Sequence, residues 1–442
     1  MLDVQGPGYR SCDGMTRRSL LKVGFLALGG LTLADMLRLK AQAAEAGEAT
    51  RDTAVILLWL GGGPSHIDMY DLKPNAAVEF RGEFREVSTN VPGTRISEHL
   101  PYESRLMDKM SVVRSVTHTN AGHGMGAHWL MTGYVPTIEI NDNLFPSVGS
   151  VVAKMRGSNA ANVPPYVCLP SPPPSSNAAY LGVSCNPFTP GNDPNNANFE
   201  VRDLRLAGQV DLSRFRGRQD LLRGLDNIRR DVDVQGNAEG YDRFYREAFE
   251  IVTSAQCRRA FDIHSEDPKM RDRYGRNSWG QSALLARRLV ESGVTFVTVN
   301  MGGWDTHSNN FNELKNSQLP KYDRAVSALI EDLYERGLDK NVLVVSYGEF
   351  GRTPRVNGTA GRDHWPGAMS VVFSGGGLKM GQMIGTTDAR AEYPTSRACG
   401  PQDVLATMYR VLGIDYRHEF HDAARRPVAI LNEGTPIDEL IG

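Results

Sequence analysis

Two apolar stretches, each ending in a run of polar residues, decide the fold. Residues 294–310 read VTFVTVNMGGWDTHSNN, residues 341–352 read NVLVVSYGEFGR, and the sequence GRDHWP follows at 361–366. A short β-branched run bounded by glycine is typical of a strand in a parallel sheet that is covered on both faces. Such sheets bind their ligands just beyond the carboxyl ends of the strands. We therefore expect the polar runs at one edge of a buried sheet.

Acidic residues and histidines are concentrated in these polar runs. They are Asp305, His307, Glu349 and His364. Carboxylate and imidazole groups bind divalent metal ions, and the neighbouring glycines allow tight backbone turns beside them. The sequence thus predicts an active centre with a metal ion at this edge.

Further strands and helices alternate along the chain. Strands are predicted at 53–60, 110–116, 164–169 and 369–374, helices at 145–155, 277–292, 322–336 and 401–412, and a hairpin from after residue 377 to 387. This alternation implies right-handed crossovers between parallel strands. We therefore predict an α/β fold with a doubly wound, mostly parallel central sheet and helices on both faces.

Two segments depart from this pattern. Residues 170–198 are rich in Pro, Ser, Asn and Gly and predict an irregular loop or lid, whereas residues 202–276 are charged and helical in pattern and predict a covering segment. No internal repeat is present in the sequence. We assign residues 44–442 to a single domain that contains both segments.

The bulk composition excludes some partners. The chain has 442 residues, of which 40% are hydrophobic, so it is long enough to bury a sizeable core. Its 49 basic and 51 acidic side chains nearly cancel, which does not favour binding to nucleic acid or to an anionic membrane. A small molecule or a neutral polymer is as compatible a partner as any.

The five cysteines are widely spaced and form no Cys-x-x-Cys pair, which excludes a disulfide scaffold and a zinc-finger spacing. Cys168 and Cys185 are near enough in sequence for a bridge. Isolated buried thiols are favoured over that bridge in a protein of this size.

The N-terminus has the features of an export signal. TRRSLLK at 16–22 precedes a modestly apolar run at 23–33, and AQA at 41–43 offers a cleavage site. This pattern resembles a twin-arginine signal peptide, so we predict a signal at 1–43, the twin-arginine export machinery as a partner, and a periplasmic or extracellular mature chain. No later apolar run reaches 18 residues, which predicts no permanent membrane span.

Two other polar stretches follow predicted strands. GGGPSHID at 61–68 contains His66 and Asp68, and residues 117–134 contain His118, His123 and His128. The first stretch lacks the Gly-Lys-Ser/Thr of a P-loop. The three histidines are five residues apart, so they would not share one face of a helix. At least one of them is expected to belong to the site.

Together these motifs resemble a known group of proteins. The order of strand, Asp-and-His loop, strand, acidic-Phe-Gly and His364 is similar to that of the alkaline phosphatase and sulfatase superfamily. More closely, the leader together with GGGPSH, GGWDTH, GEFGRTP and RDHWP resembles the exported DUF1501 family, over essentially the whole mature chain. The resemblance implies an alkaline phosphatase-like fold and two divalent metal ions, of Zn, Mn, Mg or Ca.

The resemblance also implies roles for particular residues. By position, Asp305, His307 and His364 look like the ligands of one ion, and Glu349 stands where the superfamily usually has Asp. Phe350 replaces the usual following histidine, so His66 or Asp68 is a candidate for the missing ligand. The nucleophile position falls on His123. Other candidates for the attacking group are Thr119, Thr117, Ser65 and a metal-bound water, and Arg352 or Arg114 could clamp the anion.

Two hypotheses about function follow from the residues and the resemblance. The first is an exported metal-dependent hydrolase of phosphate or sulfate esters, acting on a small-molecule or polysaccharide ester. The alternative is a catalytically inactive metal- or carbohydrate-binding module that retains the fold.

Overall fold

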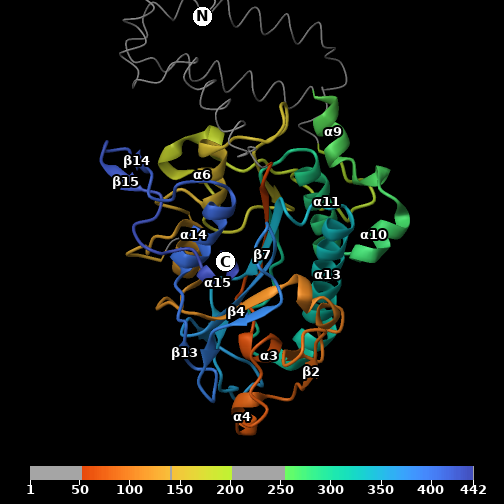
Figure 1. The fold of residues 1–442 in the computed structure, drawn as a ribbon, viewed down its shortest axis with the longest axis vertical. Coiled ribbons are helices and arrows are strands. Elements are labelled where there is room, and N and C mark those ends of the chain that lie inside the picture. The colour runs from red at the N-terminus through yellow and green to blue at the C-terminus, as the bar shows by residue number, and fades with distance from the viewer. Residues whose placement is uncertain (1–51, 140–141, 202–253, 442) are drawn as a thin grey trace, which may run out of the picture. The chain divides into compact units, whose positions relative to one another are not determined.

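The computed structural model describes residues 52–139, 142–201 and 254–441 (Figure 1). Residues 53–442 form one compact unit. The predicted signal peptide at 1–43 and most of the predicted covering segment, 202–253, lie outside the described residues. Within the described ranges, no helix combines the length and the apolar character needed to cross a membrane.

A seven-stranded sheet forms the centre of the fold. Its strands, from one edge to the other, are β11 (Gln382–Ile384), β4 (Ser111–Val116), β10 (Met369–Gly375), β7 (Val342–Tyr347), β1 (Ala54–Trp59), β6 (Phe296–Asn300) and β5 (Tyr166–Leu169). β10 runs antiparallel to both of its neighbours, whereas every other pairing in the sheet is parallel. The prediction of a mostly parallel sheet is confirmed.

Helices cover both faces of this sheet (Figure 1). Alternate residues of β1 point into two separate apolar cores, Val55 and Leu57 into one and Ile56 and Leu58 into the other. The first core is closed by α5 (His123–Thr132), α6 (Val148–Met155) and α14 (Pro401–Val411). The second is closed by α9 (Ala255–Phe261), α10 (Pro268–Tyr274), α11 (Ser278–Glu291) and α13 (Leu319–Glu335). The predicted α/β class is therefore confirmed.

Short elements connect these layers. Among the described residues, the other α-helices are α3 (His66–Met69), α4 (Val78–Arg81), α12 (Asn310–Glu313) and α15 (Asp438–Ile441). A π-helical turn, η7 (Leu314–Gln318), follows α12, and short 3-10 turns lie at Glu103–Arg105, Met107–Lys109 and Ile263–Ser265. Four two-stranded ribbons pair β2 (Glu86–Ser88) with β3 (Arg95–Ser97), β8 (Gly351–Arg352) with β9 (His364–Trp365), β12 (Thr386–Thr387) with β13 (Pro394–Ser396), and β14 (Glu419–His421) with β15 (Pro427–Ala429). Residues 170–198 contain only short 3-10 turns, at Ala179–Leu181 and Val183–Cys185.

Two local expectations differ from the structure. The hairpin predicted after residue 377, up to 387, is wrong, because β11 pairs in parallel with β4 and β12 pairs with β13. The helix predicted from residue 322 begins earlier, since α12 and η7 lead into α13 without a break. The preference for thiols over a bridge is confirmed: Cys168, Cys185, Cys257 and Cys399 are all buried, and none of these four forms a disulfide.

A buried acidic group lies on the α13 side of the sheet. Glu103 is fully buried, and its Oε2 accepts a 2.7 Å hydrogen bond from the Tyr70 hydroxyl. Asp323 of α13 lies beside it and accepts hydrogen bonds from the backbone N–H groups of Tyr102 and Glu103. Burial, and then the charge of Asp323, raise the pKa of Glu103 well above its ordinary value of 4.5. Folding therefore favours the protonated form of Glu103.

We expect the E103Q variant to change how stability depends on pH. A raised pKa in the folded state stabilises the fold below pH 4.5, and this contribution is lost as the pH rises towards the folded-state pKa. Glutamine keeps an acceptor for Tyr70 without the charge. The stability advantage of E103Q over wild type should therefore grow by up to about 1.4 kcal/mol per pH unit above 4.5, measured by urea unfolding between pH 4 and 8. The control is E79Q, at an exposed carboxylate of α4. A constant difference for E103Q across this range would contradict the account.

Candidate metal centre

The polar side chains meet at the edge of the sheet where the parallel strands have their carboxyl ends. His123 follows β4 at the start of α5, Asp305 and His307 follow β6, and Glu349 follows β7. His364 precedes β10 instead of following a strand. Because β10 is antiparallel, its amino end lies at the same edge as the carboxyl ends of the other strands. One edge of the sheet thus receives all five side chains.

The glycine loop after β1 closes against these residues. Gly62 has a φ of +111°, and a Cβ there would lie 2.5 Å from the backbone nitrogen of Asp305. Its own N–H donates a 2.8 Å hydrogen bond to Glu349 Oε1. Only glycine therefore allows this loop to approach both the Asp305 and the Glu349 loops.

Asp305 is the central residue of a cluster that consists of His123, Asp305, His307, Glu349 and His364. Its Oδ1 lies 3.0 Å from His307 Nε2 and 3.0 Å from His364 Nε2, and its Oδ2 lies 3.2 Å from His123 Nε2. Arg352 Nη2 donates to the same Oδ1 at 2.5 Å. Burial alone would raise the pKa of Asp305, but the hydrogen bond and charge of Arg352 outweigh it and hold that pKa well below its usual range. The side chain of Asp305 therefore remains a carboxylate.

Each imidazole of the cluster has its Nδ1 against an acceptor oxygen. The pairs are His307 with Asp363 Oδ1 at 2.7 Å, His364 with Ala121 O at 2.7 Å, and His123 with Glu349 Oε1 at 2.6 Å. A carbonyl or carboxylate oxygen only accepts, so each Nδ1 carries the proton, and in the neutral ring Nε2 holds a lone pair. Metal-ligating histidines show this arrangement, in which the outer nitrogen is fixed by an oxygen.

The lone pairs converge on a small volume. His307 Nε2 and His364 Nε2 lie 3.0 Å apart, and each is 3.0 Å from Asp305 Oδ1. Three acceptors at this spacing repel one another unless a proton or a cation lies among them. Ligand atoms about 2.0–2.1 Å from a tetrahedral metal ion lie about 3.3–3.4 Å from each other, a few tenths of an ångström more than the observed spacing. The ligand atoms of His123, Asp305 and His364 also lie within 4.8 Å of one another.

The charges around the cluster suit a divalent cation. Three carboxylates, those of Asp305, Glu349 and Asp363, face a single guanidinium, that of Arg352. Glu349 is 3% exposed, and its Oε2 has no hydrogen-bond partner among the described residues. A buried carboxylate oxygen without a donor is costly unless a cation compensates it. The donor set and its net negative charge therefore fit a metal ion.

The hydrogen bond to Glu349 raises the pKa of His123, against the effect of burial. Burial lowers the pKa of His364, although its hydrogen bonds to Asp305 and Ala121 oppose this. The two rings thus differ in proton affinity within one cluster. A neutral His364 is the form that can bind a metal ion.

The structure gives His66 and Asp68 other partners. Both oxygens of Asp68 bind the fully buried Arg362, at 2.7 and 2.9 Å, and Ser65 and Asn310 add hydrogen bonds to Oδ2. His66 Nε2 donates to Ala391 O at 2.9 Å. No interaction joins either side chain to the cluster in the described ranges. We therefore do not include His66 or Asp68 in the metal site.

The hydroxyl candidates do not bond to the cluster, and the arginine candidates already have partners. Thr119 is exposed, and Ser65 is buried and donates to Asp68. In the part of the chain that the structure describes, no Ser or Thr hydroxyl bonds to a side chain of the cluster. The predicted anion clamps have partners too: Arg114 pairs with Asp71, and Arg352 is fully buried and donates to Asp305, Gly62, Gly63 and Arg362.

Other parts of the site were not evident from the sequence. The histidine-rich stretch contributes His123 to the cluster, whereas His128 is buried and bonds to Tyr134 and Leu144. His118 donates to the backbone carbonyl of Glu349 at 2.8 Å. Asp363, which fixes His307, was missed, and its only signal was its position next to His364 in RDHWP.

A comparison with protein families identifies the family of this chain. The profile of a family described as "Protein of unknown function (DUF1501)" matches residues 52–441. The chain belongs to this family. No curated protein matches this chain.

Several solved structures are similar to this DUF1501 chain. Ps i-CgsB in complex with k-i-k-neocarrahexaose is 14% identical, with 82% of this chain and 72% of that chain covered and a TM-score of 0.38. The PsFucS1 sulfatase from Pseudoalteromonas sp. is 13% identical, with coverages of 86% and 70% and a TM-score of 0.34. The phosphonate monoester hydrolase SpPMH from Silicibacter pomeroyi is 9% identical, with coverages of 82% and 74% and a TM-score of 0.32.

We expect the purified protein to bind a divalent ion through this cluster. D305A and H364A should each lose most of the bound metal, because each removes one of the three converging ligand atoms. H421A, which removes an exposed histidine of β14, should keep it. Elemental analysis after dialysis against Zn²⁺ or Mn²⁺ measures the stoichiometry. Equal metal content in D305A, H364A and wild type would contradict the assignment.

Proposed function

We propose that this DUF1501 protein is a metal-dependent hydrolase of phosphate or sulfate esters. The observation that carries the proposal is the convergence of His307 Nε2, His364 Nε2 and Asp305 Oδ1 at 3.0 Å spacing on the exposed edge of the sheet. The side chains of Asp305 and His307 are 43% and 46% exposed, so a substrate can reach them. A bound divalent ion would act as a Lewis acid on an ester oxygen and activate water.

The residues of the chain would prepare the site in different ways. Arg352 holds the Asp305 carboxylate, and Asp363 and Ala121 O fix the rings of His307 and His364 so that their Nε2 atoms face inward. Glu349 holds the Nδ1 proton of His123, whose Nε2 faces Asp305 at the rim. Arg352 is thus a positioning residue in this proposal.

Water is the proposed attacking group. Thr119 and Ser65 are not bonded to the cluster, and both ring nitrogens of His123 already have carboxylate partners. Attack by water on phosphorus or sulfur would release an alcohol and a free phosphate or sulfate, without a covalent intermediate. We further propose that the mature protein acts outside the cytoplasmic membrane, because TRRSLLK at 16–22 resembles a twin-arginine signal.

A metal-binding module without turnover is the second candidate. It is favoured by one observation: the arginine nearest the cluster, Arg352, is buried and already donates to four acceptors, so it is not free to bind a substrate anion. Such a module would keep the metal ion but release no product.

Turnover of aryl phosphate and aryl sulfate esters by the metal-loaded protein separates the two candidates. We expect release of the phenol, a loss of at least about a hundredfold in D305A and H364A, and wild-type rates in H421A. T119A should retain turnover within about threefold, which corresponds to less than 1 kcal/mol in the barrier. Stoichiometric metal with no turnover of either ester class would favour the second candidate. Loss of turnover in T119A would contradict attack by water.

A further inference from the structure

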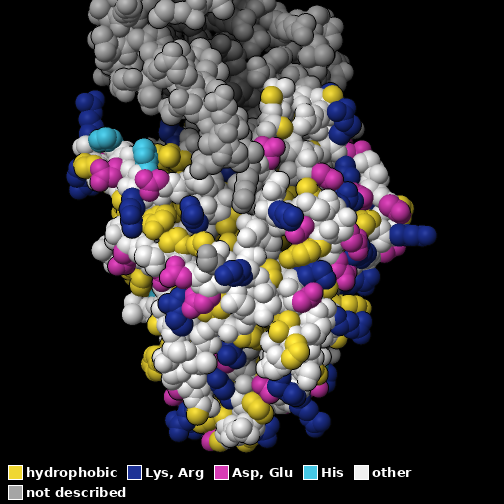
Figure 2. All heavy atoms as spheres, viewed as in Figure 1, with side chains coloured by type: hydrophobic (Ala, Val, Ile, Leu, Met, Phe, Trp, Pro, Cys, Tyr) yellow, Lys and Arg dark blue, Asp and Glu magenta, His cyan; other side chains and the backbone are white. Residues whose placement is uncertain are grey.

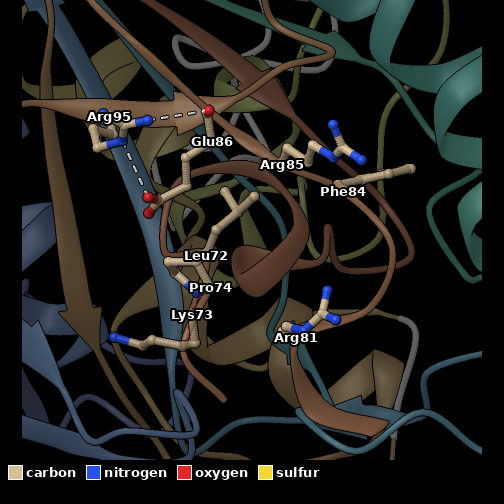
Figure 3. Close-up of a pocket in the computed structure, with 8 residues that line it drawn as sticks. All are labelled: Leu72, Lys73, Pro74, Arg81, Phe84, Arg85, Glu86 and Arg95. Atoms are coloured by element: carbon tan, nitrogen blue, oxygen red, sulfur yellow. Dashed lines mark hydrogen bonds and ion pairs between the residues drawn. The ribbon is translucent and has the colours of Figure 1, made fainter. Parts of the chain in front are cut away.

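A basic pocket of about 250 Å³ lies beside helix α4 and the ribbon of β2 and β3. Its charged lining residues are Lys73, Arg81, Arg85, Arg95 and Glu86. Figure 3 shows Arg95 and Glu86 on one side of the pocket and Arg81 and Arg85 on the other, with Leu72 and Pro74 between them. The pocket is therefore a local concentration of positive charge in a chain whose net charge is only −2.

The positive charges of the pocket are only partly compensated. Arg95 pairs with Glu86 at 3.2 Å, and Lys73 pairs with Asp71 at 3.0 Å. Asp71 is shared, because Arg114 Nη1 also lies 3.4 Å from the same oxygen.

Two arginines of the pocket remain without a carboxylate. Neither Arg81 nor Arg85 forms an ion pair with any described residue, and Arg81 makes only a 3.4 Å hydrogen bond to the carbonyl of Gly82. Glu83, which lies between them in sequence, is exposed and forms no ion pair with either. Four cations of the lining thus face two acidic partners, Glu86 and Asp71, and the excess is two positive charges. Figure 2 shows several Lys and Arg side chains around the α4 end of the view.

The segment that carries these arginines is fixed to the loops of the metal centre. Arg362 Nη2 donates to Phe80 O at 3.0 Å, and Val356 N donates to Glu79 O at 2.8 Å. Phe84 packs edge-on against Phe311, with ring centroids 5.4 Å apart. Arg362 directly precedes Asp363 and His364, and Phe311 lies four residues after His307. The segment that carries Arg81 and Arg85 is therefore joined to loops that also carry residues of the cluster.

We propose that this pocket binds a second oxyanion, a sulfate or a phosphate, of a polyanionic polymer whose neighbouring ester occupies the metal centre. The proposal rests on the proposed function only in naming that polymer as the substrate. Arginine guanidinium groups bind the oxygens of sulfate and phosphate in pairs, and Arg81 and Arg85 have no competing carboxylate. The apolar residues Leu72, Pro74 and Phe84 reduce screening by water, which strengthens the attraction.

Equilibrium binding of fluorescently labelled dextran sulfate to the full chain tests this pocket. We expect R81Q/R85Q to bind at least about tenfold more weakly than wild type, because two charge-assisted contacts are lost. The control K154Q/R410Q removes the same charge from exposed positions on α6 and α14, away from α4 in Figure 1, and should bind as wild type does. Neutral dextran should not bind, and polyphosphate in a parallel titration shows which oxyanion the pocket prefers.

The results can separate this inference from the proposed function. Equal weakening in the two double variants would show that bulk charge, not the pocket, binds the polymer, and would overturn the inference. Failure of wild type to bind either polyanion would overturn it too. Because binding is read without turnover, it can also be measured in the D305A background, where R81Q/R85Q should still weaken binding of dextran sulfate at least about tenfold. Loss of metal or of turnover with binding retained would overturn the proposed function alone.

Discussion

The site depends on the hydrogen bonds that the buried guanidinium of Arg352 donates. It donates to Gly63 O at 2.8 Å, to Arg362 O at 3.1 Å and to Asp305 Oδ1 at 2.5 Å. These acceptors belong to the loop after β1, the segment before β9 and the loop after β6. A charge removed from water must be paired and fully hydrogen-bonded. Arg352 therefore fixes three loops together and keeps the Asp305 carboxylate in one position.

The direction of one strand completes the arrangement. If β10 ran parallel to β7, the segment before it would lie at the opposite edge of the sheet, and His364 could not reach Asp305. Its antiparallel pairing with both β4 and β7 brings His364 beside His307. The rings are then oriented by oxygens on their outer nitrogens, Asp363 for His307 and Ala121 O for His364. The site is thus preorganised by the fold before any ion binds.

Much of the fold and part of the site could be predicted from local sequence. Runs such as 294–299 are β-branched and apolar, so the strands could be located. Because sites form beyond the carboxyl ends of parallel strands, Asp305 and Glu349 could be predicted to lie at the same edge of the sheet. The direction of β10 and the pairing of β11 depend on long-range contacts that leave no local pattern. Asp68 follows a strand much as Asp305 does, yet Arg362, 294 positions away, occupies both of its oxygens. No local feature of the sequence distinguishes these two aspartates.

The most direct test of the central claim is anomalous X-ray diffraction from crystals grown with Zn²⁺ or Mn²⁺. The account predicts a peak bounded by Asp305 Oδ1, His307 Nε2 and His364 Nε2, with Arg352 still bound to Asp305. A peak that lies elsewhere, or an ordered cluster without a peak in which the two imidazoles hydrogen-bond directly to each other, would contradict it.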